Sequence, residues 1–228
     1  MKPQALYETL WQAVQGREED IVLRCGDKSL SYGALFQGIL QAEAGLRALG
    51  VGPGELGTLF SLNTPEAVMA FYAIDRIGAV ANWVDMKVSP AEVEEYLTQA
   101  GSRVALVLEV AFSKVYHHRG KAPTQHFVVL PLAPYVAPEL EGKLHLSTWQ
   151  QGAGPDCLSW ADFLRPPAQV PPEADRWEEP VAITYTGGTT GPAKGVVLSR
   201  RSFAWALEYY TRAETEYGRG GFALVLLP

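Results

Sequence analysis

The sequence predicts an α/β fold in which a parallel sheet is flanked by helices on both faces. Segments with one apolar stripe at helical spacing alternate with short apolar runs along much of the chain. These runs, of which residues 104–108 are the clearest, lack the polar alternation of a strand that has one face in water. A chain of 228 residues, 47% of them hydrophobic, can also bury a large core.

The expected elements begin with a clear helix after Ser31, whose apolar residues share one stripe and which Gly50 is placed to stop. Residues 56–62 form an apolar run and predict a buried strand. Thr64, followed by proline and glutamate, is a typical helix start because its hydroxyl can cap the first turn. That helix leads to the next predicted strand, residues 79–84.

The following segment repeats this pattern with sharper signals. Ser89 and Glu92 have the spacing of a capping box, in which each side chain accepts a hydrogen bond from the other residue's backbone amide. Further strands are expected at residues 104–108 and from His126 onward, with a helix between them. The regular alternation breaks after about Leu132.

We expect the chain to fall into three parts. Residues 1–164 form an N-terminal α/β lobe, and residues 165–180 form a proline-rich linker. Proline at this density forbids a helix or a central strand. Residues 181–228 are expected to begin a second lobe that is truncated at the end of the sequence.

Composition limits the classes of partner. The formal net charge of −6 argues against general nucleic-acid binding, which needs a basic face. The 2 cysteines and 4 histidines show no ligand spacing, so neither a disulfide framework nor a metal site is expected. The N-terminus lacks the apolar core of a signal peptide, and no stretch approaches the roughly 18 apolar residues of a transmembrane segment. These features predict a cytoplasmic protein.

The most informative stretch is ITYTGGTTGPAKGVVLS, residues 183–199. β-Branched and aromatic residues precede its glycines and a valine pair follows them, so the loop is expected to join two strands. A Walker loop would need Gly-Lys-[Ser/Thr] at the start of a helix, and here the lysine stands between an alanine and a glycine. The dinucleotide fingerprint also fails, because the first two glycines are adjacent and no helix follows directly.

The residue types in this loop suit a polyphosphate. Glycines let backbone amides approach an anion, threonine hydroxyls add donors, and a lysine ammonium can follow the phosphate oxygens as charge redistributes. A glycine-rich turn without a ligand is the alternative, but a tight turn needs fewer glycines and no lysine. The candidate phosphate-binding residues are Thr186, Gly187, Gly188, Thr189, Thr190, Gly191 and Lys194.

Residues 185–195, YTGGTTGPAKG, resemble the phosphate-loop signature Y-T-[SG]-G-T-T-G-x-x-K-G of the adenylate-forming superfamily, which includes acyl-CoA synthetases. Glycine at position 187 resembles the long-chain fatty acyl-CoA ligase branch. The resemblance extends upstream over residues 29–55 and 63–106, so that it covers most of the chain, and it is weakest around residues 133–175. After the loop the family often continues LSHRN, whereas this chain has LSRRS, residues 198–202.

The resemblance implies a two-step reaction. A carboxylic acid attacks the α-phosphorus of ATP to give an acyl-adenylate and pyrophosphate, and a thiol, usually coenzyme A, then displaces AMP. The loop residues named above would hold the β- and γ-phosphates, with Mg²⁺ bridging the triphosphate. The adenylation lysine and the other catalytic segments of the family lie beyond position 228, so the catalytic residues are unknown.

The chain therefore resembles an N-terminal portion of such an enzyme, expected to be inactive alone. Either a longer synthetase has been cut, or the short form is natural and acts with a complementary chain. An open sheet edge would also favour self-association. A non-catalytic nucleotide- or partner-binding module is the alternative function, whereas a Walker-type phosphotransferase would need a helix after Gly195. Arg200 and Arg201 could approach phosphate, but are expected to be surface cations.

Overall fold

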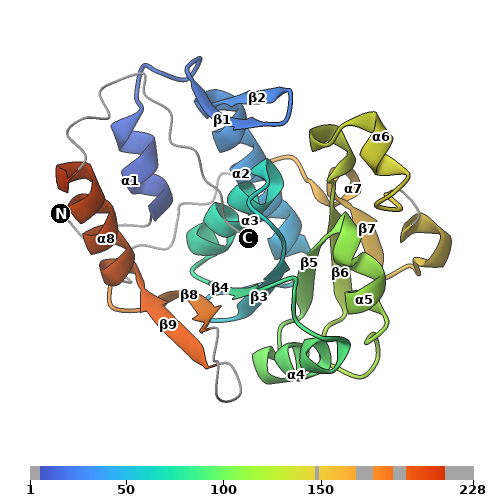
Figure 1. Ribbon diagram of the computed structural model, residues 1–228. Coiled ribbons are helices and arrows are strands. Elements are labelled where there is room, and N and C mark those ends of the chain that lie inside the picture. The colour runs from blue at the N-terminus through green and yellow to red at the C-terminus, as the bar shows by residue number, and fades with distance from the viewer. Residues whose placement is uncertain (1–5, 147–148, 168–176, 187–193, 214–228) are drawn as a thin grey trace.

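The computed structural model describes residues 6–146, 149–167, 177–186 and 194–213, with side chains described up to residue 206 (Figure 1). The helices are α1 (Leu6–Ala13), α2 (Tyr32–Ala48), α3 (Pro65–Ile77), α4 (Pro90–Ala100), α5 (Phe112–Tyr116), α6 (Pro138–Glu141), α7 (Trp160–Phe163) and α8 (Arg200–Ala213). The strands are β1 (Ile21–Cys25), β2 (Lys28–Ser31), β3 (Leu56–Phe60), β4 (Val80–Val84), β5 (Val104–Leu108), β6 (His126–Leu130), β7 (Cys157–Ser159), β8 (Pro180–Tyr185) and β9 (Gly195–Ser199).

The described residues form one seven-stranded sheet in the order β7-β6-β5-β3-β4-β8-β9, and a separate β1–β2 ribbon. All neighbours in the large sheet run parallel except β8 and β9, which are antiparallel. The helices α2 and α3 cover one face, and α4 and α5 cover the other (Figure 1). The predicted α/β fold with a parallel sheet between two helical layers is confirmed.

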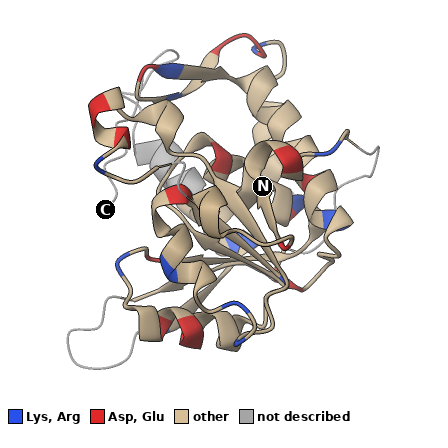
Figure 2. Cartoon of the chain, turned by 90° about the vertical axis from the view of Figure 1, so that its right-hand side faces the viewer, with Lys and Arg blue, Asp and Glu red and all other residues tan. Residues whose placement is uncertain are grey.

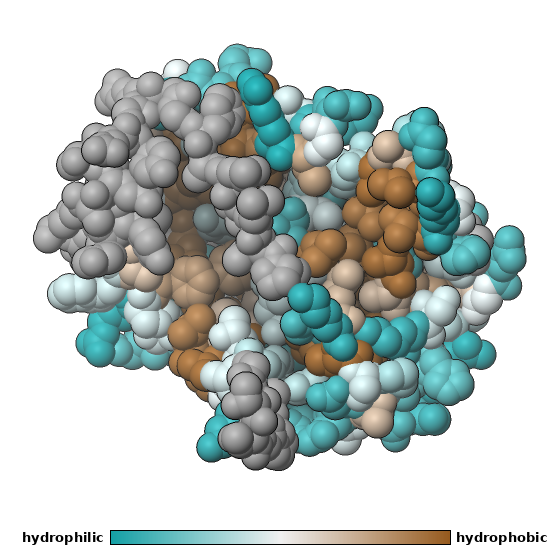
Figure 3. Space-filling model, viewed as in Figure 1, coloured by the Kyte–Doolittle hydropathy of each residue, from teal (hydrophilic) through white to brown (hydrophobic). Residues whose placement is uncertain are grey.

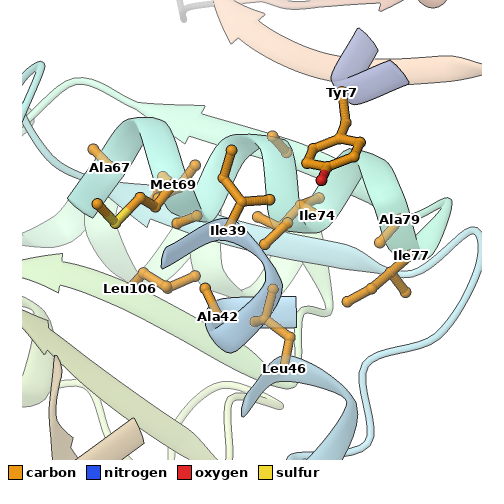
Figure 4. Packing of buried hydrophobic residues seen from close by; sticks show 14 of the residues in the cluster. Tyr7, Ile39, Ala42, Leu46, Ala67, Met69, Ile74, Ile77, Ala79 and Leu106 are labelled. Atoms are coloured by element: carbon orange, nitrogen blue, oxygen red, sulfur yellow. The ribbon is translucent and has the colours of Figure 1, made fainter. Parts of the chain in front are cut away.

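Strand β5 shows why the apolar runs carry no polar alternation. All five of its residues are buried. Leu106 packs into the cluster with α2 and α3, whereas its neighbours Ala105 and Val107 pack into the cluster with α4 and α5. Successive side chains of a strand point to opposite faces, so a strand covered on both sides must be apolar at every position. Figure 4 shows Leu106 facing residues of α2 and α3.

The predicted helix starts are confirmed in detail. The hydroxyl of Thr64 accepts the amide of Ala67 at 3.3 Å at the start of α3. Ser89 and Glu92 form the expected capping box at the start of α4, with distances of 2.7 and 3.4 Å. Helix α2 ends at Ala48, and Gly50, the expected stop, follows two residues later with a left-handed φ of 82°.

Other elements were not expected. The short strand β7 pairs with β6 at the edge of the sheet, and α7 follows it directly. The structured stretch from residue 157 to residue 163 lies in the part of the sequence where the regular alternation breaks. The division of the chain at residues 165–180 stays a prediction, and the strands on its two sides, β7 and β8, belong to one sheet.

Charged residues of both signs lie among one another along the chain, as the blue and red segments of the cartoon in Figure 2 show. None of the described helices combines the length and the apolar character that a bilayer crossing demands. The prediction that the chain does not bind nucleic acid stays a prediction.

Candidate functional site

The glycine- and threonine-rich loop is the tip of a β-hairpin. Strands β8 and β9 pair antiparallel, with Tyr185 opposite Gly195. Beyond this pair, the amide of Thr186 donates to the carbonyl of Lys194 at 3.0 Å. The amide of Lys194 lies 3.4 Å from the hydroxyl of Thr186, to which it donates. The expectation of strands on both sides of the loop is confirmed, and a Walker arrangement is excluded because β9 follows the loop.

Two of the predicted site residues belong to the described part of the chain. Thr186 and Lys194 are both exposed and lie where the loop leaves the two strands, which we call the hairpin mouth. The remaining candidates lie outside the described residues, and their role stays a prediction; they are Gly187, Gly188, Thr189, Thr190 and Gly191.

The hairpin mouth lies at the side of the sheet where the parallel strands have their carboxyl ends, which we call the carboxyl edge. Strand β8 runs parallel to β4, so Thr186 follows the carboxyl end of β8 next to the β4–α4 connection. Lys114 holds that connection by donating to the carbonyls of Met86 and Val88, the latter at 2.9 Å. Ligands of open α/β sheets bind outside the carboxyl ends of the strands, so the loop has the expected position for a binding site.

Tyr185, the last residue of β8, was not predicted as a site residue. Its phenol donates to Oδ1 of Asn82 at 2.8 Å, and its ring lies 4.4 Å from that of Tyr96 on α4. Burial raises the pKa of Tyr185, with a smaller contribution from Tyr96, so the phenol stays protonated and can donate near neutral pH. The signal in the sequence was Asn82, a polar residue within an otherwise apolar strand.

The hairpin is closely packed at its loop end, where Gly195 pairs with Tyr185. A Cβ added to Gly195 would lie 3.2 Å from Cγ2 of Ile183 and 3.4 Å from the ring of Tyr185. A larger residue at this position would therefore press first on Ile183 and lie against Tyr185. The glycine that ends the loop signature thus has a packing role as well.

The structure shows that the expectation for Arg200 is wrong. It was expected to be a surface cation, yet it is 1% exposed. Its Nε donates to Oδ1 of Asp75 at 2.7 Å, and its Nη2 donates to the carbonyl of the same residue at 3.0 Å. The reason is position: Arg200 directly follows β9 and turns inward against α3. Arg201 is exposed and pairs with Glu178 at 2.7 Å, so for this residue the expectation is confirmed.

A surface hollow of about 470 Å³ is lined by Ser199, Arg201, Ser202 and Trp205. It lies at the far end of β9 from the loop mouth, because Ser199 ends the strand that Gly195 begins. It is therefore separate from the candidate phosphate site. No group of three or more potential metal ligands from His, Cys, Asp and Glu occurs among the residues that the structure describes.

Comparison with known proteins links these features to a family. The sequence profile of the AMP-binding enzyme family matches residues 10–227. The long-chain-fatty-acid–CoA ligase of Thermus thermophilus is 33% identical over 194 residues, covering 83% of this chain and 32% of the relative. The acetyl-coenzyme A synthetase of Pseudoalteromonas atlantica is 28% identical over 206 residues, covering 86% of this chain and 29% of the relative.

Solved structures agree on the fold. The anthranilate CoA ligase AuaEII, in complex with anthranoyl-AMP, superposes with a TM-score of 0.77 at 22% identity. That match covers 90% of this chain and 36% of the ligase. The chain thus spans about a third of the length of the relatives named above. Since the family profile matches nearly all of its residues, the chain belongs to the AMP-binding enzyme family.

Proposed function

We propose that this chain carries the triphosphate-binding part of a ligase that activates a carboxylic acid with ATP and transfers the acyl group to coenzyme A. The single observation that carries the proposal is the hairpin mouth, where Thr186 and Lys194 lie exposed at the carboxyl edge of the sheet. The names of the relatives, which are CoA ligases and synthetases, support the same reaction class.

In the proposed first step, the carboxylate oxygen of the acid attacks the α-phosphorus of ATP. The bond between the α-phosphorus and the bridging oxygen breaks, which leaves an acyl-adenylate and pyrophosphate. The hairpin holds the β- and γ-phosphates: backbone amides and the Thr186 hydroxyl donate hydrogen bonds, and the Lys194 ammonium stabilises the charge that builds on the leaving pyrophosphate. In the second step the thiol of coenzyme A attacks the acyl carbon, and AMP leaves.

A magnesium ion fits this scheme as a companion of the nucleotide. The described residues contain no carboxylate cluster that would hold it independently, whereas the triphosphate itself offers oxygen ligands. When bound, the ion neutralises phosphate charge. The contribution of this chain is the ammonium of Lys194 and the hydroxyl of Thr186 at the same phosphates.

We further propose that the 228 residues bind nucleotide without completing the reaction alone, because the chain spans about a third of the length of its CoA-ligase relatives. The same fact favours a second candidate function, a non-catalytic nucleotide- or partner-binding module. Acid-dependent exchange of radiolabelled pyrophosphate into ATP separates the two. Exchange that appears only when the rest of a family member is supplied supports the ligase, and nucleotide binding that never leads to exchange supports the module.

The direct test of the site is calorimetry with ATP and Mg²⁺. We expect Lys194→Ala to weaken binding about tenfold, since it removes one charge-assisted contact to phosphate. The matched control is Lys28→Ala, which removes an exposed lysine from β2, away from the loop. Equal effects of the two substitutions, or no binding by the unmodified chain, would contradict the assignment of the loop to the triphosphate.

Location and assembly complete the proposal. We propose a cytoplasmic protein, a compartment in which the free thiols of Cys25 and Cys157 would stay reduced. Strand β9 is the last strand in the order of the described sheet, and its Val196 and Val197 are 41% and 57% exposed. Figure 3 shows apolar surface in this region. Such an edge favours self-association by strand pairing, which sedimentation measurements at several concentrations would detect.

A further inference from the structure

A buried polar network runs through the sheet beneath α4. Asn82 and Thr58, at the centres of β4 and β3, are both 0% exposed. The Nδ2 of Asn82 donates to Oγ1 of Thr58 at 3.1 Å. The hydroxyl of Thr58 is 2.6 Å from that of Ser102, just before β5. Together with the bond from Tyr185 to Asn82, these contacts join four segments of the chain.

The network has a direction across the sheet. Tyr185 ends β8 at the carboxyl edge, next to the loop, whereas Ser102 precedes β5 at the opposite edge. Thr58 and Asn82 are neighbours in the β3–β4 register. The network therefore extends diagonally from the base of the phosphate loop into the interior of the molecule.

Placing these groups in the core is costly unless each one is paired. A buried amide or hydroxyl without a partner destabilises the folded state by more than an ordinary hydrogen bond stabilises it. Asn82 uses its carbonyl oxygen for Tyr185 and its amino group for Thr58, so both ends of the amide are satisfied only when β8 lies in one register against β4. The pairing thus selects the position of Tyr185.

We propose that Tyr185 is a positioning residue for the phosphate loop, acting through its hydrogen bond to Asn82. The proposal rests on the function proposed above. The residue after Tyr185 is Thr186, whose amide closes the hairpin on Lys194 at 3.0 Å. Fixing the phenol on Asn82 and its ring on Tyr96 fixes the backbone from which the loop departs. Thr186 and Lys194 then meet the phosphates from a position that is already fixed, so less ordering is needed on binding.

The competing explanation is that the network only stabilises the fold. Substitutions at its two ends separate the explanations. Tyr185→Phe removes the hydroxyl next to the loop, and Ser102→Ala removes a hydroxyl of the same network at the other edge. Both leave a buried polar group with one partner fewer, so both lower the thermal stability. Only Tyr185→Phe touches the residue that precedes the loop.

The first measurement needs no ligand. Amide hydrogen exchange of Thr186, read by NMR on the intact 228-residue chain, reports how firmly the hairpin is closed. We expect Tyr185→Phe to speed exchange at this amide about tenfold, and Ser102→Ala to leave it unchanged within a factor of about two. Equal acceleration by both variants, or none by Tyr185→Phe, would overturn the positioning role.

The second measurement is affinity for ATP with Mg²⁺. We expect Tyr185→Phe to raise the Kd about tenfold, and Ser102→Ala to leave it unchanged. Asn82→Leu should raise the Kd as Tyr185→Phe does. The double variant should bind no more weakly than Asn82→Leu alone, because both substitutions remove the same bond between Tyr185 and Asn82, and Asn82→Leu removes the bond to Thr58 as well. Additive losses would overturn the proposal.

The two proposals fail in different ways. If the unmodified chain does not bind ATP, the proposed function fails, and the exchange rate of Thr186 still decides whether Tyr185 fixes the hairpin. If the unmodified chain binds ATP and Tyr185→Phe binds equally well, the positioning role fails while the proposed function stands.

Discussion

The guanidinium of Arg200 donates to the carboxylate of Asp75 at 2.7 Å, although the two residues are 125 positions apart in the chain. Both are buried, and Oδ2 of the same carboxylate accepts the backbone amide of Tyr7 at 3.3 Å. One carboxylate on α3 therefore joins the end of the β8–β9 hairpin to the N-terminal helix. The hairpin that carries the loop is held at one end by this ion pair and at the other by Tyr185.

Replacing Arg200 by alanine should destabilise the protein strongly. Removing one partner of a buried ion pair leaves the other charge uncompensated, which costs about 3–5 kcal/mol. Urea unfolding followed by circular dichroism measures the loss. The control is Arg201→Ala, which breaks an exposed pair with Glu178 and should cost at most about 1 kcal/mol. Equal losses for the two neighbouring arginines would show that the Asp75 pair contributes no more than a surface contact.

Glu92 should stabilise the fold in a pH-dependent way. The side-chain hydroxyl and then the backbone amide of Ser89 bind its carboxylate and hold its pKa below the ordinary value of 4.5. A lowered pKa contributes stability above pH 4.5 that is lost as the pH falls through the folded-state value. Thermal unfolding of the native chain and of Glu92→Gln should therefore differ at pH 7 and converge towards pH 3. A constant difference would argue against the capping box as the cause.

Glu66, in the first turn of α3, should show the opposite trend. Burial raises its pKa above 4.5, and the hydrogen bond from Tyr135, at 2.6 Å, offsets this effect only in part. A raised pKa contributes stability below pH 4.5 that is lost as the pH rises through the folded-state value. The stability of Glu66→Gln relative to the native chain should thus increase between pH 4 and pH 7 in the same unfolding assay. A decrease would show that the ionised carboxylate is the favoured form.

The contrast between Glu92 and Glu66 shows what local patterns can predict. The capping box of Ser89 and Glu92 is a relation between residues three positions apart, so the sequence alone indicates it. Whether a helix start is exposed or buried depends on which elements pack over it. Tyr135, the partner of Glu66, lies 69 positions further along the chain. No short-range pattern predicts such a pair.

The same distinction applies to the fold and to the site. Apolar runs predicted β3, β4, β5 and β6, because a strand that is covered on both faces is apolar at nearly every position and can be identified from its own residues alone. Strand β7 escaped prediction since three half-buried residues give no periodic signal. At the site, the loop motif indicated Thr186 and Lys194, whereas the burial of Arg200 arises from α3, an element distant in sequence.

The final prediction concerns Gly45, at which α2 packs closely against α7. Alanine normally favours a helix over glycine by about 1 kcal/mol. At Gly45, however, an added Cβ would lie 2.5 Å from the backbone oxygen of Phe163. The backbone of α7 would have to move, so we expect Gly45→Ala to destabilise the protein by about 1–3 kcal/mol in urea unfolding.

The matched control is Gly142→Ala, at the end of α6. Gly142 has an ordinary helical φ of −66°, and an added Cβ there would meet nothing within 4 Å. This substitution should raise the free energy of unfolding by about 0.4–1 kcal/mol, because it restricts the unfolded chain without straining the folded one. If Gly45→Ala were also stabilising, then α2 and α7 could not be in the close contact that Gly45 and Phe163 make in the structure.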